Sequence, residues 1–184
     1  MRLFAALPVS GEARQELERK LAEYRREAWP VKWVRDGGLH VTIKFLGEVE
    51  EFAVADICAA LRGAARRTMP LRFVPTEIGA FPSFTGARVL WAGYETESAL
   101  ELMVHRVEQE AAKLGFPGDG HPFRPHVTLG RVRQGGRLIA EAVQRLESER
   151  LASGFSTDRL VLYHSRLEAG GPTYDELDSF PLSE

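Results

Sequence analysis

Two copies of one short motif hold the residues with the clearest potential for catalysis. Each copy places a histidine two positions before a threonine and ends on an aliphatic residue: His40-Val41-Thr42-Ile43 and His126-Val127-Thr128-Leu129. On a β-strand, residues two positions apart share a face and lie roughly 6.5–7 Å apart. An imidazole and a hydroxyl at that separation can hold one phosphate group between them. Each motif therefore predicts half of a phosphate-binding site.

Paired histidines suit displacement at phosphorus. One group must take a proton from the attacking water, and a second must give a proton to the oxygen that leaves on the far side. The ordinary imidazole pKa of about 6.5 makes both protonation states accessible near neutral pH. We therefore expect His40 and His126 to be the catalytic pair, with Thr42 and Thr128 binding phosphate oxygens. The local symmetry leaves open which histidine is the acid.

The two motifs belong to a longer internal repeat. Their histidines are 86 residues apart (126 − 40 = 86), and the same offset places the strand-like segment 2–6 over the segment 88–92. A repeated supersecondary unit is the usual meaning of such self-similarity. We expect two repeat units at about 2–87 and 88–172, with a closing segment at 173–182, all within one bilobal domain covering residues 1–184.

Each repeat unit has the same predicted order of elements. A short strand is followed by an amphipathic helix, a loop rich in glycine or proline, the histidine strand, a second helix, and one or two further strands. We predict an α+β fold of two pseudo-symmetric lobes, each with a mainly antiparallel sheet and helices outside, and a cleft between the lobes. A doubly wound parallel sheet ranks second, because the glycine-rich phosphate loop of such folds is missing.

Composition narrows the class of protein. The formal net charge is −2, which excludes a generally basic duplex-binding surface, so any contact with nucleic acid must be local. The single cysteine cannot form an internal disulfide and fits a reducing compartment. No apolar run is long enough to span a membrane, and the N-terminal segment is too short for a signal peptide. We expect a cytoplasmic protein without membrane contact.

The motifs resemble those of the two-histidine phosphoesterase superfamily. More narrowly, the chain is similar to the RNA 2',3'-cyclic phosphodiesterases, formerly described as 2'-5' RNA ligases. The likeness covers nearly the whole chain, including the opening 2–8 and the ending 171–174. Its specific part is two segments: His40-Val41-Thr42-Ile43-Lys44-Phe45-Leu46-Gly47 and Phe123-Arg124-Pro125-His126-Val127-Thr128-Leu129-Gly130-Arg131.

This resemblance implies a reaction and residue roles. It implies metal-independent hydrolysis of a terminal 2',3'-cyclic phosphate to a 2'-phosphate, without a cofactor, on RNA ends or nucleotides that bear the cyclic phosphate. By motif, His40 matches the proton donor and His126 the proton acceptor. Thr42 and Thr128 match the phosphate-contacting threonines, and Arg131 matches an arginine placed near the phosphate. We expect a monomer with no obligatory protein partner.

The possible roles of three residues beside the motifs depend on which way their side chains point. Strict alternation puts Lys44 on the face of His40, where it is a candidate for substrate contact. Alternation puts Phe45 in the core, although a base-stacking role is the alternative. It also puts Arg131 on the face opposite His126, unless Gly130 breaks the pleat and lets the arginine turn back.

Three other functions compete with a cyclic phosphodiesterase. A metal hydrolase needs more ligands than two distant histidines, and no carboxylate or cysteine stands beside them at ligand spacing. A binding module for RNA ends or nucleotides could grip a cyclic phosphate without turnover. A 2'-5' ligase is the same chemistry in reverse, and without coupling to ATP we expect it to be a side activity.

Overall fold

The computed structural model describes residues 1–35, 37–118, 120, 122–168 and 171–183. Its nine strands are β1 Arg2–Pro8, β2 Val31–Trp33, β3 His40–Glu48, β4 Leu71–Phe81, β5 Val89–Thr96, β6 His126–Val132, β7 Phe155–Thr157, β8 Arg159–Glu168 and β9 Gly171–Pro181. Its four α-helices are α1 Gly11–Tyr24, α2 Val54–Ala65, α3 Ser98–Lys113 and α4 Ala140–Ser148, with short 3-10 turns at Glu51–Ala53 and Phe84–Gly86. None of these helices is long and apolar enough to cross a membrane.

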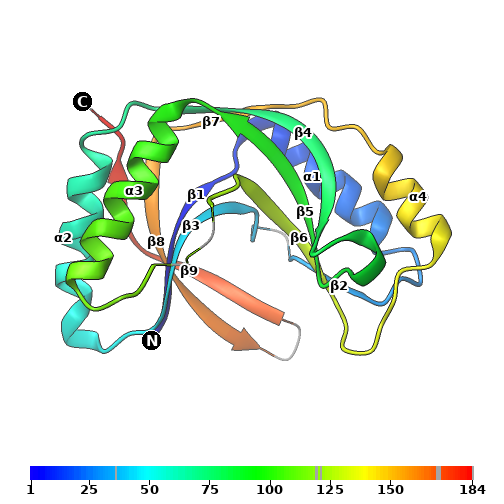
Figure 1. Cartoon of the computed structure of the whole chain (residues 1–184), viewed down its shortest axis with the longest axis horizontal. Helices are drawn as coiled ribbons and strands as arrows, with labels where there is room; N and C mark the ends of the chain where they lie inside the picture. The colour runs from blue at the N-terminus through cyan, green and yellow to red at the C-terminus, as the bar shows by residue number, and fades with distance from the viewer. Residues whose placement is uncertain (36, 119, 121, 169–170, 184) are drawn as a thin grey trace.

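The sheet is antiparallel throughout the described residues, in the order β7-β4-β5-β6-β3-β1-β8-β9, with β2 also paired to β6. The prediction of an α+β fold with antiparallel pairing is confirmed, and the second-ranked parallel sheet is wrong. The two halves of the sheet meet at the centre, where Val41 of β3 pairs with Val127 of β6. The two predicted sheets are therefore one curled sheet (Figure 1).

Two lobes flank that central pair. The first lobe contains β1, β3, β8 and β9, covered by α2 and α3; the second contains β2, β4, β5, β6 and β7, covered by α1 and α4 (Figure 1). Each lobe thus combines elements from both halves of the chain. The first helix and the last strand of each expected unit cross to the other lobe. The repeat itself, at about 2–87 and 88–172, remains a prediction.

Strand β1 shows why the centre of the sheet is buried on both faces. Its sequence is almost entirely apolar, as expected for a strand without a solvent face. Leu3, Ala5 and Leu7 point into the main core beneath the helices. Phe4 and Ala6 point the other way, into a smaller aromatic cluster. The second face of β1 therefore forms part of the surface that faces the space between the lobes.

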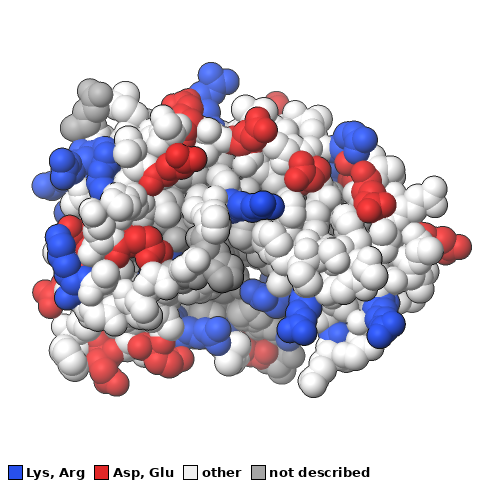
Figure 2. Space-filling model, in the orientation of Figure 1, with Lys and Arg blue, Asp and Glu red and all other residues white. Residues whose placement is uncertain are grey.

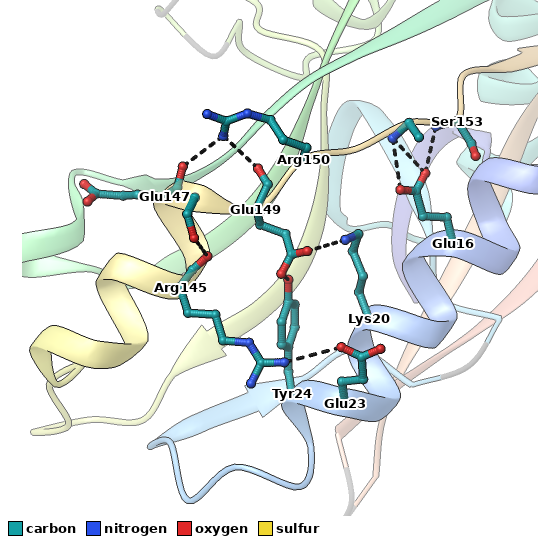
Figure 3. A network of polar contacts seen from close by, with 11 residues as sticks. Glu16, Lys20, Glu23, Tyr24, Arg145, Glu147, Glu149, Arg150 and Ser153 are labelled. Atoms are coloured by element: carbon teal, nitrogen blue, oxygen red, sulfur yellow. Dashed lines mark hydrogen bonds and ion pairs between the residues drawn. The ribbon is translucent and has the colours of Figure 1, made fainter.

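A polar network fixes α1 against the segment that follows α4 (Figure 3). The Glu149 carboxylate accepts hydrogen bonds from Lys20 Nζ at 2.5 Å and from Tyr24 Oη at 2.9 Å. The Glu16 carboxylate accepts hydrogen bonds from the backbone N–H groups of Ala152 and Ser153. Burial alone would raise the pKa of the Glu149 carboxyl, but the bonds from Lys20 and Tyr24 outweigh it, and the pKa is lowered.

We expect Glu149→Gln to lower the free energy of unfolding by about 1–3 kcal/mol, because the partly buried Lys20 ammonium loses its carboxylate. The folded-state pKa of Glu149 lies below its usual value, so its contribution is present above the unfolded-state pKa and disappears as pH falls through the folded-state pKa. Urea denaturation at pH 7 and at pH 3 measures the difference. Glu147→Gln, at an exposed position on α4, is the control. Equal stability of both variants at pH 7 would contradict the network.

Candidate active site

The two motif histidines lie beside the central Val41–Val127 pair. Antiparallel pairing at these valines, extended by one residue in each direction, sets His40 opposite Thr128 and Thr42 opposite His126. All four side chains share the face away from Val41 and Val127, which are fully buried. The structure therefore brings the four predicted residues together around one approximate twofold centre.

A cavity of about 380 Å³ lies on this face, between the lobes. His40, Thr42 and Phe45 line it from the first lobe, and Thr128 and Arg131 line it from the second. The predicted cleft between the lobes is confirmed. Its volume falls within the range of pockets that hold small ligands. His126 is not among the lining residues; it lies next to the cavity, near enough for its charge to act on His40.

Each histidine ring is held by a backbone carbonyl two residues earlier. His126 Nδ1 donates to the carbonyl of Arg124 at 2.8 Å, and the ring of His40 donates to the backbone of Gly38. A ring nitrogen used in this way fixes the orientation of the imidazole and leaves the other nitrogen for proton transfer. In His126 the nitrogen left for proton transfer is Nε2.

Both imidazoles favour the neutral form. Burial lowers the pKa of His40 to about 4, against the opposing hydrogen bond to Gly38, and the charge of His126 lowers it further. Burial also lowers the pKa of His126, and the nearby Arg131 guanidinium adds to that shift. At pH 7 the unliganded site thus holds two neutral histidines beside an arginine. Such a site favours an incoming anion, because the anion offsets the positive charge.

Aromatic rings enclose each histidine, an arrangement that periodicity alone did not predict. The ring centroid of His40 lies 4.8 Å from Phe4, 5.8 Å from Tyr163 and 5.1 Å from Tyr174. His126 lies 5.1 Å from Phe81 and 6.3 Å from Trp91. These rings displace water and cause the burial that depresses the pKa values. On the almost uniformly apolar β1, no polar alternation could have identified Phe4 as a site residue.

A bulge follows each threonine and reverses the side-chain alternation. In the β1–β3 ladder, Thr42 pairs with Ala6 and Lys44 with Ala5, so Ile43 is the extra residue. In the β5–β6 ladder, Thr128 pairs with Trp91 and Gly130 with Leu90, so Leu129 is extra. The bulged residue is the fourth of each motif in both lobes. One added residue shifts every later side chain to the other face.

These bulges overturn two expectations about side-chain direction. Lys44 is not on the cavity face: it is 1% exposed, and its Nζ bonds Glu108 on α3 at 3.0 Å and the carbonyl of Pro117. Phe45 is not in the core: it is 55% exposed and lines the cavity. The prediction that Lys44 contacts the substrate is therefore wrong. Phe45, in contrast, is placed where its ring could stack on a base.

The same device explains Arg131. The bulge at Leu129 turns the arginine to the cavity face, where it lines the wall opposite the lobe of Phe45. Arg131 and Phe45 are again 86 residues apart (131 − 45 = 86), so one position carries a cation in one lobe and an aromatic ring in the other. The site is symmetric at its histidines and threonines and asymmetric at the residues beyond them.

Comparison with known proteins agrees with the motifs. The model of the LigT like phosphoesterase family matches residues 7–91 and 94–174. An RNA 2',3'-cyclic phosphodiesterase of Archaeoglobus fulgidus is 33% identical over 180 residues, covering 98% of this chain and 99% of the relative. One of Geobacillus stearothermophilus is 31% identical over 97% of this chain, and the chain spans 56% of that relative's length.

Solved structures share the fold. The protein TT0787 of Thermus thermophilus superposes with a TM-score of 0.80 at 29% identity, covering 99% of this chain and 98% of that one. Escherichia coli LigT complexed with 3'-AMP also gives a TM-score of 0.80, at 22% identity over the whole chain and 98% of LigT. The family predicted from the repeated histidine motif is confirmed: the chain belongs to the LigT like phosphoesterases, a two-histidine phosphoesterase family.

Proposed function

We propose that this protein is an RNA 2',3'-cyclic phosphodiesterase that opens a terminal 2',3'-cyclic phosphate to a 2'-phosphate without a metal or cofactor. The observation that carries the proposal is the crossed arrangement at the Val41–Val127 pair, where each histidine stands opposite the other motif's threonine. A phosphate centred there meets an imidazole on each side and a hydroxyl next to each imidazole. The relatives of similar length named for this reaction support the substrate class.

The proposed mechanism uses the two imidazoles in turn. His126, neutral and with Nδ1 engaged by Arg124, accepts the proton of the attacking water at Nε2. His40 gives a proton to the departing 3' oxygen on the opposite side. Thr42 and Thr128 donate hydrogen bonds to the non-bridging oxygens, and Arg131 stabilises the charge that develops on them. A 5'-hydroxyl in the place of the water would form a 2'-5' diester by the same steps, which makes weak 2'-5' ligation a side reaction of the same site.

The charge of the bound substrate is needed to bring His40 into the protonated form that acts as the acid. With a pKa of about 4, His40 is neutral in the free protein at pH 7, whereas proton donation needs the imidazolium. A phosphate anion placed beside the ring favours the protonated form and raises the pKa of His40. We thus assign to the bound phosphate a second role, in which it charges the acid that then protonates its own leaving group.

Anion binding is accordingly expected to take up protons. Sulfate is a suitable probe because it has no proton to lose between pH 5 and pH 7. At pH 5.5 the free protein holds His40 neutral, because its pKa of about 4 lies below that pH. The bound anion raises the pKa of His40, so protons enter the complex. Calorimetry in two buffers of different ionisation enthalpy measures the uptake. Sulfate binding without proton uptake would contradict the assignment, and His40→Gln is expected to take up fewer protons than the unmodified protein.

The direct test is incubation with a nucleoside 2',3'-cyclic phosphate, with and without a chelator such as EDTA. We expect a 2'-monophosphate to form at the same rate in both samples. Saturable binding without product would instead support a binding module. Loss of turnover in EDTA, restored by a divalent cation, would support a metal hydrolase. We propose that the protein acts as a monomer in the cytoplasm, on RNA ends or nucleotides.

A further inference from the structure

Two cations face each other across the β2–β6 ladder. Lys32 of β2 is paired directly with Arg131 of β6, so both side chains point to the same face. Both are exposed, and both line the cavity. Like charges at directly opposed positions destabilise a sheet. Among the described residues no carboxylate forms an ion pair with either of them. The pair therefore carries an unbalanced positive charge into the cavity.

Lys32 lies opposite Arg131, near the end of β6 that is away from His126. Arg131 is three residues beyond Thr128, or roughly 10 Å along the strand. Lys32 stands across from it, and its side chain runs to the start of β9. A Cβ on Gly171 would lie 2.9 Å from Lys32 Cε and 3.6 Å from its Nζ. Glycine at position 171 thus leaves room for the lysine to reach across the cavity between β2 and the β8–β9 hairpin.

The positive charges that line the cavity are more than one bound phosphate would neutralise. Arg2, Lys32, Arg35 and Arg131 line it, and no aspartate or glutamate of the described residues does. Figure 2 shows Lys and Arg side chains at the edge of a hollow near the middle of this face. Arg35 pairs with Glu168 at 3.1 Å, and Arg131 is assigned to the reacting phosphate. Within the described part of the chain, Arg2 and Lys32 are left without an ion-pair partner, and of these two Lys32 is the one paired directly with Arg131 across the sheet.

We propose that Lys32 binds a second phosphate, the one on the 5' oxygen of the nucleotide whose cyclic phosphate is opened. The proposal rests on the proposed function and deepens it. A nucleoside 2',3'-cyclic phosphate lacks this group. A free nucleotide with a 5'-phosphate has it, and so does the last residue of an RNA chain. The cavity thus distinguishes substrates by their number of phosphates. It binds the reacting phosphate between the histidines and the 5'-phosphate at Lys32.

Three substrates and one substitution test this. The substrates are adenosine 2',3'-cyclic phosphate, its 5'-phosphorylated form, and the dinucleotide ApA ending in a 2',3'-cyclic phosphate. We expect Lys32→Gln to lower kcat/KM about 5- to 20-fold for the two substrates with a 5'-phosphate, and less than about twofold for the nucleoside. The slope of log(kcat/KM) against log[salt] for the dinucleotide should fall by about one. Lys113→Gln, at an exposed position on α3, removes the same charge and should change none of these values.

The pattern across substrates decides the outcome. A loss for both 5'-phosphorylated substrates supports the subsite, and a loss for the dinucleotide alone supports it for RNA chains rather than free nucleotides. An equal loss for all three substrates would overturn it, because Lys32 would then act on the reacting phosphate or through the general field. No loss for any of them would overturn it as well.

Binding of products separates this proposal from the proposed function. Dissociation constants of adenosine 2'-phosphate and adenosine 2',5'-bisphosphate need no turnover. We expect Lys32→Gln to raise the Kd of the bisphosphate about 5- to 20-fold and to leave that of the 2'-phosphate within about twofold. If the unmodified protein hydrolyses none of the three substrates, the proposed function fails, while these two constants still report on the subsite. Equal shifts of both constants would contradict it.

Discussion

Replacing either motif histidine is expected to lower kcat by about 10²- to 10⁴-fold, the usual contribution of a positioned proton-transfer group. His126→Ala removes the proposed base, and His40→Ala removes the proposed acid. Because the two act on opposite sides of one phosphorus, the double variant should be little worse than either single variant. Steady-state hydrolysis of a nucleoside 2',3'-cyclic phosphate, measured at saturating substrate, gives the comparison.

The controls separate catalysis from packing. His40 is packed among three aromatic rings, so alanine leaves a hole, and His40→Gln offers a variant that fills it. His105→Ala, at an exposed position on α3, should retain full activity. Thermal unfolding shows that each variant is folded. A folded His40→Gln or His126→Ala variant that keeps turnover within about threefold of the unmodified protein would rule out paired proton transfer.

The second large effect is expected at Arg131. Arg131→Ala should lower kcat/KM for a nucleoside 2',3'-cyclic phosphate by about 10- to 10²-fold, because a charged donor to the phosphate is lost. Lys44→Gln should leave kcat/KM within about threefold, because Lys44 points away from the cavity and into its contacts with Glu108 and Pro117. The lysine substitution should instead lower the free energy of unfolding by about 1–3 kcal/mol.

The contrast tests the two strand bulges. If the strands alternated without interruption, Lys44 would face the phosphate and Arg131 would not. A folded Lys44→Gln variant with a severe loss of kcat/KM, beside an Arg131→Ala variant with none, would favour that uninterrupted geometry. Phe45→Ala tests the bulge in the first lobe. It should lower kcat/KM only if the bulged strand places that ring in the cavity.

The sequence predicted the site correctly where the two-residue alternation of a β-strand continues without interruption. His40 and Thr42 sit one full β period apart, as do His126 and Thr128, so their shared faces follow from alternation alone. Their repetition at a fixed offset indicated two matching strands, and the structure joins those strands at Val41 and Val127. The order of elements alone also fitted a parallel sheet; the antiparallel α+β class was preferred because the glycine-rich phosphate loop is missing and the histidine strands have one polar face.

Prediction failed where partners distant in the sequence decide the geometry. The bulge at Ile43 has no local signature, and the only local signal for the bulge at Leu129 is the Gly130 that follows it. In both strands the pairing with β1 or β5 creates the extra position. Lys44 is buried because Glu108, on a helix from the other half of the chain, supplies its carboxylate. The ring of Tyr174 reaches His40 through the β8–β9 hairpin, a long-range contact that periodicity does not encode.

The position of the phosphate in the product tests the account most directly. Hydrolysis of a nucleoside 2',3'-cyclic phosphate in ¹⁸O-enriched water can be followed by ³¹P NMR, which resolves 2'- from 3'-monophosphate and detects the label on phosphorus. One water attacking in line with a protonated 3' oxygen predicts only the 2'-monophosphate, with one ¹⁸O in its phosphate. A 3'-monophosphate or a mixture of the two isomers would contradict the assignment of the His40 proton to the 3' oxygen, and an unlabelled product would contradict attack on phosphorus by a water that His126 activates.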